Sequence, residues 1–308
     1  MTPAARAQWQ IHACVLLWGF TAILGKAITL PAMALVVWRM ALVAAALLLV
    51  PRVWRGLRAM PVRLLGIYAG IGALVALHWL TFYGSIKLAN ASVAVTCIAL
   101  ATVFLPVVEP WVTGRRFQPR ELLLGIAVVP GVALVVGGVP AGMRLGIVVG
   151  TISAVLVAIF GALNKRYVER ADALTVTFVE LGAGGLLLAL AAPLIPWFGS
   201  PWMLPGLHDG AMLLVLALAC TLLPFALSLV ALRNMSAFAA QLAINLEPVY
   251  AIVLAVLLLG EQRELGAMFY AGVVIILSGV FLHPLLTRGP RHKPDPATLG
   301  TSEAKALD

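Results

Sequence analysis

The sequence predicts an all-α polytopic membrane protein with ten transmembrane helices, arranged as two inverted five-helix repeats. Three observations lead to this prediction: an extreme composition, a series of long apolar runs, and features that recur at a constant spacing. Of the 308 residues, 62% are hydrophobic and only 11% are charged, and the mean hydropathy is +1.05. Soluble domains carry about 25% charged residues, so a soluble globular fold is excluded.

The apolar runs divide the chain into ten predicted spans. A helix needs roughly 20 apolar residues to cross a hydrocarbon core of about 30 Å, and short polar segments separate the runs. The first run could be a signal peptide, but no small-residue cleavage site follows it and nine more runs do, which favours a first membrane helix. The predicted spans are residues 11–25, 32–50, 64–86, 93–113, 122–138, 145–163, 174–195, 211–232, 237–259 and 266–286.

These spans define the predicted organisation. Residues 1–10 form a cytoplasmic N-terminus, 11–138 the first repeat, 145–286 the second, and 287–308 a disordered cytoplasmic tail. The connections are short, so no separate soluble domain is expected. The loop 196–209 carries Trp197 and Trp202 but no Lys or Arg, which suits the outer interface.

The basic residues predict the orientation. With the N-terminus in the cytoplasm, 16 of the 21 Lys and Arg fall in cytoplasmic segments, which is the bias that orients membrane helices. The cytoplasmic ones are Arg6, Arg52, Arg55, Arg58, Arg63, Arg115, Arg116, Arg120, Lys165, Arg166, Arg170, Arg233, Arg288, Arg291, Lys293 and Lys305. The opposite side receives Lys26, Lys87, Arg144 and Arg263. We therefore expect a multi-pass protein of the bacterial inner (plasma) membrane with both termini cytoplasmic. The net charge of +9 is spread between the spans, so a nucleic-acid partner is not expected.

Matching features recur about 142 to 148 residues apart. Asn90-Ala-Ser corresponds to Asn234-Met-Ser, the fourth and ninth spans both close on a glycine followed by charge, and Phe160-Gly echoes Trp18-Gly. Gly131-Val and Gly279-Val mark the helices that follow. Five spans per copy is an odd number, so the copies must have opposite orientation. Inverted repeats are typical of secondary transporters, whose sites lie near the membrane midplane.

The ninth span carries the most informative stretch. It is almost unbroken apolar sequence with one charge inside, Glu247, followed at once by Pro248. An ionised carboxylate near the midplane costs on the order of 3 kcal/mol or more, and proline can kink a helix. Glu247 is either an inert buried acid or part of a transport site at a broken helix, and the second reading favours a transporter.

The residues also carry a family resemblance. Trp18-Gly19 with Lys26, Arg39, and the run Asn245-Leu-Glu247-Pro-Val-Tyr250 through Gly260-Glu261, with Gly272 and Gly279 downstream, resemble the EamA family of the drug/metabolite transporter superfamily. The resemblance covers about residues 11–286. It implies a ten-helix exporter or permease with cytoplasmic termini and a central cavity, often moving amino acids or other small metabolites. The first half departs from the pattern, because Arg115-Arg116 follow Gly114 where Gly-Glu is common.

Two further charges lie deep within spans. Arg39 is in the second span and Glu180 in the seventh, its partner in the repeat. A lone buried charge is costly unless paired. We expect Arg39 to pair with Glu247 or with an acidic group of the substrate, the alternative being a static structural ion pair.

Aromatic and histidine side chains cluster in the third span. His78, Trp79 and Phe82 share a helix face, and Tyr83 lies four residues beyond Trp79. These side chains either line a cavity or only pack against neighbouring helices or the membrane interface. The expected substrate-binding residues are Trp18, Arg39, His78, Trp79, Tyr83, Asn245, Glu247 and Tyr250. The proton-coupling candidates are Glu247, His78 and Glu180, because burial disfavours a charged group and makes it titratable.

Other polar residues have simpler interpretations. Glu109 is six residues from Arg115, so snorkelling or pairing with Arg115 or Arg116 is favoured. Asn164-Lys165-Arg166 is interpreted as a positive-inside anchor. The three cysteines lie in apolar runs and suit packing.

The predicted function is an inner-membrane secondary transporter of small metabolites, working by alternating access around a midplane cavity. The expected partners are a small-molecule substrate and the lipid bilayer, and both a monomer and a homodimer fit. No cofactor, metal or catalytic residue is expected: the glycine-rich stretch 19–26 has the wrong spacing for a phosphate-binding loop. Two alternatives stay open: a membrane-embedded enzyme acting on lipid, and a non-transporting sensor or assembly subunit.

Overall fold

The computed structural model describes residues 2–127, 129–244 and 246–286, and every regular element in these ranges is helical. The first half contains α1 (Pro3–Ala27), α2 (Ala32–Leu48), α3 (Pro51–Ala59), α4 (Val62–Leu88), α5 (Ala91–Ile98), α6 (Ala101–Thr113), α7 (Pro119–Ala127) and α8 (Val129–Gly137). The second half contains α9 (Arg144–Tyr167), α10 (Ala173–Ala191), α11 (Leu207–Ala217), α12 (Leu223–Leu232), α13 (Ala237–Ile244), α14 (Glu247–Leu254) and α15 (Ala267–Leu286). Short 3-10 turns are η1 (Ala141–Met143), η2 (Ala192–Leu194), η3 (Pro196–Phe198) and η6 (Glu261–Arg263); the π-helical turns are η4 (Leu218–Leu222) and η5 (Ala255–Leu259).

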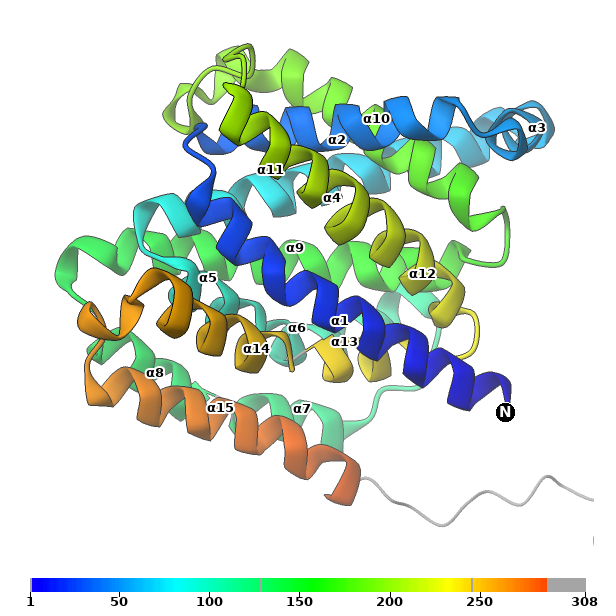
Figure 1. Ribbon diagram of the computed structural model, residues 1–308. Coiled ribbons are helices and arrows are strands. Elements are labelled where there is room, and N and C mark those ends of the chain that lie inside the picture. Colours follow the sequence, from blue (N-terminus) through cyan, green and yellow to red (C-terminus); the bar gives the residue numbers. More distant parts are fainter. Residues whose placement is uncertain (1, 128, 245, 287–308) are drawn as a thin grey trace, which may run out of the picture.

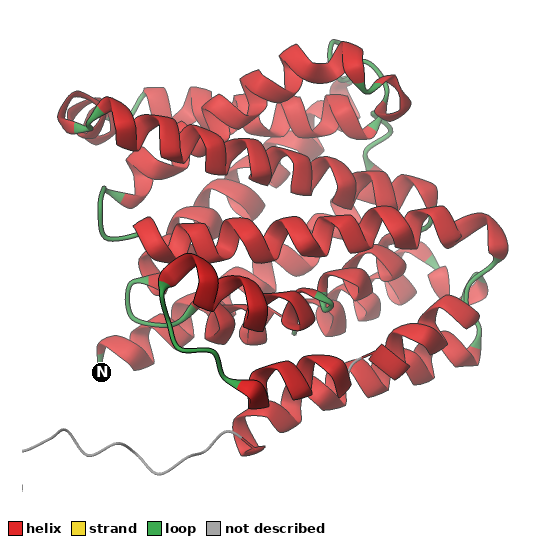
Figure 2. Ribbon diagram, turned by 180° about the vertical axis from the view of Figure 1, so that it is seen from behind, coloured by secondary structure: helices red, strands yellow, loops and turns green. Residues whose placement is uncertain are grey.

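The long helices lie side by side along one direction, across the view of Figure 1. α9 packs against α4 and α6, α1 against α12 and α14, α10 against α2 and α4, and α8 against α15. In Figure 1 α2 and α10 lie at the top of the molecule, and α7, α8 and α15 at the bottom. The start of α1 and the end of α15 lie on the same side in both ribbon views (Figures 1 and 2).

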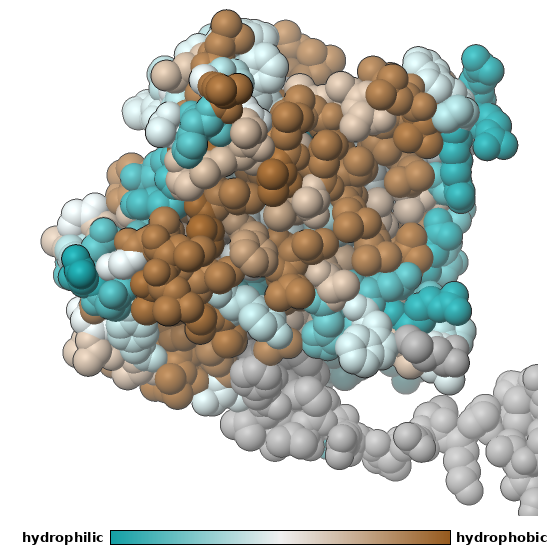
Figure 3. Space-filling model, in the orientation of Figure 1, coloured by the Kyte–Doolittle hydropathy of each residue, from teal (hydrophilic) through white to brown (hydrophobic). Residues whose placement is uncertain are grey.

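The described helices fit a membrane. Seven helical segments are long and apolar enough to cross a bilayer, or eight if α2 and α3, which meet at 92°, are counted as one bent span. Two shorter apolar segments are Glu247–Leu259 and Ala267–Ser278. Apolar side chains dominate the middle of the face shown in Figure 3, and hydrophilic ones gather toward the sides where helices end. The sequence prediction of an all-helical membrane protein is thus confirmed.

Helix α1 begins eight residues before the predicted first span. The side-chain oxygen of Thr2 accepts a hydrogen bond from Ala5 N at 3.2 Å, and Pro3 occupies the first helical turn. Both are favourable at a helix start, because the first N–H groups have no partner within the helix. The helix therefore includes residues that the sequence analysis assigned to a separate N-terminal segment.

Two spans are broken near their middles, one in each half. The first is α5 followed by α6; the second is α13 followed by α14. Pro248 lies in the first turn of α14, where its missing N–H removes no helical hydrogen bond, so a new helix begins there instead of a kink. Both spans end on a glycine with positive φ, 77° at Gly114 and 69° at Gly260, a conformation that glycine adopts without strain.

Glycines permit close helix contact at specific positions only. A Cβ on Gly131 would lie 2.7 Å from the Gly272 carbonyl oxygen, and a Cβ on Gly272 would lie 2.4 Å from that of Gly131. By contrast, Gly66 and Gly70 have open space where a side chain would be. No neighbouring helix therefore requires glycine at Gly66 or Gly70.

Candidate functional site

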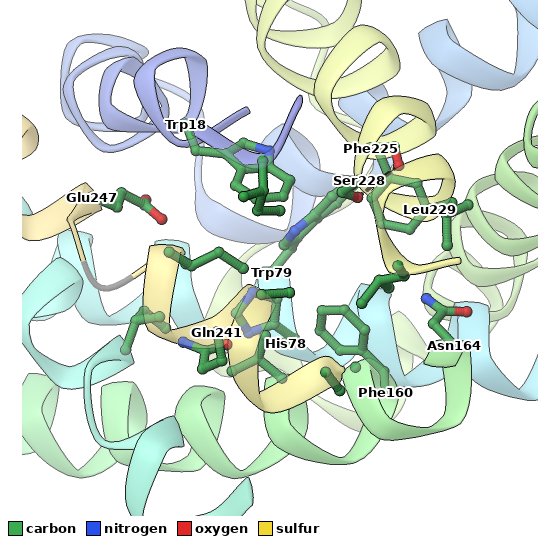
Figure 4. A pocket seen from close by; sticks show the side chains of 18 of the residues that line it. Trp18, His78, Trp79, Phe160, Asn164, Phe225, Ser228, Leu229, Gln241 and Glu247 are labelled. Carbon is green, nitrogen blue, oxygen red and sulfur yellow. Dashed lines mark hydrogen bonds between the residues drawn. The ribbon is translucent and has the colours of Figure 1, made fainter. Parts of the chain in front are cut away.

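A cavity lies between the two halves of the chain. It is lined by α1, α2, α4, α5 and α6 from the first half and by α9, α12, α13 and α14 from the second. Its volume is about 120 Å³, room for several water molecules, since one needs roughly 10–15 Å³. The polar and aromatic residues of the wall are Trp18, Thr21, Arg39, His78, Trp79, Phe82, Phe160, Asn164, Phe225, Ser228, Gln241 and Glu247. Figure 4 shows most of these side chains converging from opposite helices.

Arg39 supplies a fixed positive charge to the wall. Its guanidinium lies 3.8 Å from the centre of the Trp79 ring and donates to the Tyr83 hydroxyl at 2.7 Å. A second hydrogen bond runs to Thr221. Because the described part of the chain places no carboxylate within ion-pair distance of Arg39, the predicted pair with Glu247 is not formed. The aromatic rings and hydroxyls hold the guanidinium at the wall, and Arg39 can meet an anionic group of a ligand.

Glu247 faces the same cavity from the first turn of α14 (Figure 4). Among the described residues, no donor lies within hydrogen-bonding distance of its carboxylate, and the side chain is buried. The start of a helix favours a negative charge, because the first N–H groups point toward it. Arg39 and Glu247 therefore present a guanidinium and a carboxyl group to one space without forming an ion pair with each other.

His78 lines the wall with one ring nitrogen already engaged. Its Nδ1 lies 2.8 Å from Ser153 Oγ and 3.0 Å from the Ser153 carbonyl oxygen. The ring stacks on Phe82 at 6.3 Å and contacts Phe160 at 5.3 Å between centroids. This arrangement fixes the ring orientation, and it combines the packing role with a position at the cavity.

The structure places the predicted binding residues in three groups. Trp18, Arg39, His78, Trp79 and Glu247 line the cavity. Tyr83 is fully buried behind Arg39, to which it is hydrogen-bonded, and its side chain does not line the cavity. Tyr250 is 42% exposed, its Cβ lies against Gly19, and it is not part of the cavity wall. Asn245 lies outside the described residues.

Several wall residues were missed by sequence reasoning. Asn164, Gln241, Phe160, Phe225 and Ser228 all line the cavity. Asn164 was assigned to a charged anchor, but it lies on the inward face of α9, one residue before the lysine. The repeat contained a signal for Phe160, because it corresponds to Trp18 and both line the wall. No comparable signal marked Gln241 or Ser228.

Glu180 does not line the cavity, although it is buried just behind it. It lies in α10 with no exposed surface, and Asn164 Nδ2 donates to its Oε2 at 3.3 Å. Asn164 thus separates Glu180 from the cavity. The described residues contain no group of three or more His, Cys, Asp or Glu side chains that could hold a metal ion.

Glu109 has a partner that the sequence did not suggest. Its two oxygens accept hydrogen bonds from Ala237 N at 3.0 Å and Phe238 N at 2.9 Å, at the start of α13. Arg115 is 3.7 Å from Glu109 and is mainly engaged by Glu121. The expected pairing with Arg115 is therefore secondary to a cap on another helix.

Comparisons with known proteins agree with the fold. The model of the EamA-like transporter family matches residues 7–137 and again 144–283. No curated protein matches the chain significantly. A solved structure described only as "Crystal structure of protein" is similar with a TM-score of 0.65 and 18% identity, covering 92% of this chain and 99% of its own. At that identity, the likeness concerns the fold alone.

Proposed function

Because this chain belongs to the EamA-like transporter family, we propose that it is a secondary transporter that moves small metabolites, such as amino acids, across the bacterial inner membrane. The observation that carries the proposal is the cavity between the two halves, with Arg39 and Glu247 at its wall. A guanidinium and a carboxyl group held apart in an otherwise apolar and aromatic space suit a small zwitterionic or charged solute. A ligand pocket of mainly apolar lining with a few placed polar groups is the usual form of such sites.

The proposed architecture has ten membrane helices as two inverted repeats. Its support is the reciprocal packing: α4 packs on α9 as α12 packs on α1, and α6 packs on α9 as α14 packs on α1. Exchanging the halves exchanges these contacts, while the pairs α2–α10 and α8–α15 map onto themselves. An even number of crossings also agrees with the two ends of the described helices lying on one side (Figure 1).

The proposed mechanism is alternating access around this cavity. Its wall includes Asn164, Leu232 and Ala237, near the ends of α9 and α12 and the start of α13, which is the side we propose to be cytoplasmic. At the opposite side Asp209 accepts hydrogen bonds from Thr29 N and Oγ1, and Lys87 donates to the Ile28 carbonyl. These contacts tie α4 and α11 to the α1–α2 loop and support a cavity closed on the outer side.

The test is flux into proteoliposomes containing the purified full-length protein, using a panel of labelled metabolites with and without an imposed pH gradient. We expect solute-specific flux that Arg39→Gln and Glu247→Gln each reduce. Glu169→Gln is the matched control, because Glu169 is an exposed acid that does not line the cavity. Absence of flux for every solute from well-folded protein would contradict the transporter and favour a non-transporting membrane subunit.

A further inference from the structure

Two buried oxygen atoms behind the cavity have no hydrogen-bond partner. They are Oε1 of Glu180 and Oδ1 of Asn164, on neighbouring helices α10 and α9. The two side chains are already joined by Asn164 Nδ2 donating to Glu180 Oε2 at 3.3 Å. Glu180 has no exposed surface and Asn164 is 3% exposed. Buried polar atoms nearly always have a hydrogen-bond partner, so two unpaired oxygen atoms in one contact require an explanation.

A single proton on Glu180 would satisfy both atoms. An ionised carboxylate and an amide oxygen are both acceptors, so neither can donate to the other. A protonated carboxyl group has one O–H donor, which can point to the amide oxygen while the amide N–H donates to the second carboxyl oxygen. The acid and the amide then form two hydrogen bonds side by side, and no acceptor is left alone.

The surroundings provide no other neutralising partner. From α2, Arg39 is held by Tyr83 and Thr221, and from α4 the Tyr68 hydroxyl donates to the Tyr167 carbonyl at 2.8 Å. The ion pairs among the described residues do not include Glu180. The remaining charged groups on or beside the elements around α10 are Arg52, Arg55 and Arg58 of α3, Arg63 and Lys87 of α4, Arg144, Lys165 and Arg166 of α9, Glu169, Arg170 and Asp172 before α10, and Arg233 after α12.

A metal cation fits the pair poorly. Hard cations in proteins take about six or more oxygen ligands, whereas this contact offers two free oxygens. No cluster of acidic or other metal-binding side chains surrounds them in the described ranges. The proton is the cation that needs only one donor oxygen and one acceptor oxygen.

We propose that Glu180 and Asn164 form the proton-binding site of this transporter, connected to the cavity by Asn164. The inference rests on the proposed function, because Asn164 is the member of the pair that lines the transport cavity, where Figure 4 shows it at one edge. The carboxylate takes one proton from cavity water and returns it to water, so only an O–H bond is made or broken. A substrate group that hydrogen-bonds Asn164 competes with Glu180 for the same amide, and this competition links substrate binding to proton binding.

The first experiment detects the proton directly. Infrared difference spectra of the purified full-length protein, recorded as a function of pH, report protonated carboxyl groups through their carbonyl absorption. We expect a protonated-acid band that Glu180→Gln removes and Glu247→Gln retains. Asn164→Leu should keep the band and shift it toward the frequency of an acid without a hydrogen-bonded partner. A wild-type spectrum unchanged by Glu180→Gln overturns the proposal. If that variant does not fold, an unchanged band in Asn164→Leu overturns it.

The second experiment separates this inference from the proposed function. In proteoliposomes, the ratio of solute flux with and without a pH gradient should exceed one in the wild type and fall to about one in Glu180→Gln. A ratio that Glu180→Gln leaves at the wild-type value overturns the proton site while the transporter stands. A Glu180 band in protein that moves none of the solutes upholds the protonated pair and overturns the transporter, and with it the coupling role.

Discussion

Glu109 and Glu261 each cap the first turn of the broken span in the opposite half of the chain. Glu109, near the end of α6, accepts from Ala237 N and Phe238 N, and Glu261, just after η5, accepts from Ala91 N and Ser92 N, both at 2.9 Å. Both carboxylates are almost fully buried. The two broken spans therefore hold each other at opposite ends. The second half uses the acid that follows its closing glycine, whereas the first half has Arg115 there and uses Glu109.

The caps predict a stability loss in each half. Glu109→Gln and Glu261→Gln each replace one accepting oxygen with an NH2 group that faces a backbone N–H, so one helix donor is left unpaired. Loss of a helix cap costs about 1–2 kcal/mol. We expect each variant to lower the melting temperature of the detergent-solubilised protein, and Glu169→Gln to leave it unchanged. Equal melting temperatures for all three would show that the caps contribute nothing.

The contacts of Arg39 predict that transport depends on the shape of its guanidinium group as well as on its charge. Arg39→Lys keeps the positive charge but cannot hold the Trp79 ring, Tyr83 and Thr221 together, since only the guanidinium is a planar fork. We expect solute flux to fall about tenfold, which corresponds to about 1.4 kcal/mol.

Tyr83→Phe is the matched variant for this prediction. It removes one hydrogen bond of about 1 kcal/mol and leaves the guanidinium over the ring. Its flux should fall less than that of Arg39→Lys. A greater loss in Tyr83→Phe would mean that the hydroxyl acts on the solute itself.

The contact between Gly131 and Gly272 predicts opposite effects for two glycine substitutions. Gly131→Ala places a methyl group against the backbone of α15, so α8 and α15 must separate and the melting temperature should fall. Gly70→Ala points into open space and gains the helix propensity of alanine, about 1 kcal/mol. Its melting temperature should be equal or higher. Thermal unfolding of both variants in one detergent decides this, and a harmless Gly131→Ala would mean that these helices are not in contact.

The proposed orientation predicts which cysteines a membrane-impermeant maleimide reaches. The native Cys14, Cys97 and Cys220 are buried and can be replaced first. In right-side-out vesicles, Trp202→Cys should react at once, and Arg116→Cys should react only after the membrane is opened. The reverse pattern would invert the proposed topology.

Most of the fold was predictable because the bilayer imposes a simple rule on sequence. A helix must satisfy its own backbone in lipid, so apolar length alone located the helices. Helix ends were less predictable, since they depend on local capping groups. Thr2 caps α1, which begins eight residues before the predicted span, and Pro248 lies in the first turn of a new helix where a kink was expected. The place of Asn164 on the cavity side of α9 was not predictable, because Asn164 is followed directly by Lys165 and Arg166 and the sequence there is typical of a charged helix end.

By itself, the sequence determined the membrane class, the repeat and the residues whose burial needs an explanation, because charge is scarce in lipid and each exception stands out. Only the tertiary structure decided the partners of those exceptions. Arg39 faces aromatic rings instead of Glu247, Glu109 caps a helix 128 residues away, and Glu180 meets Asn164. The physical reason is that a buried polar group must be satisfied by whichever group folding brings within about 3 Å, and spacing along the chain does not encode that distance.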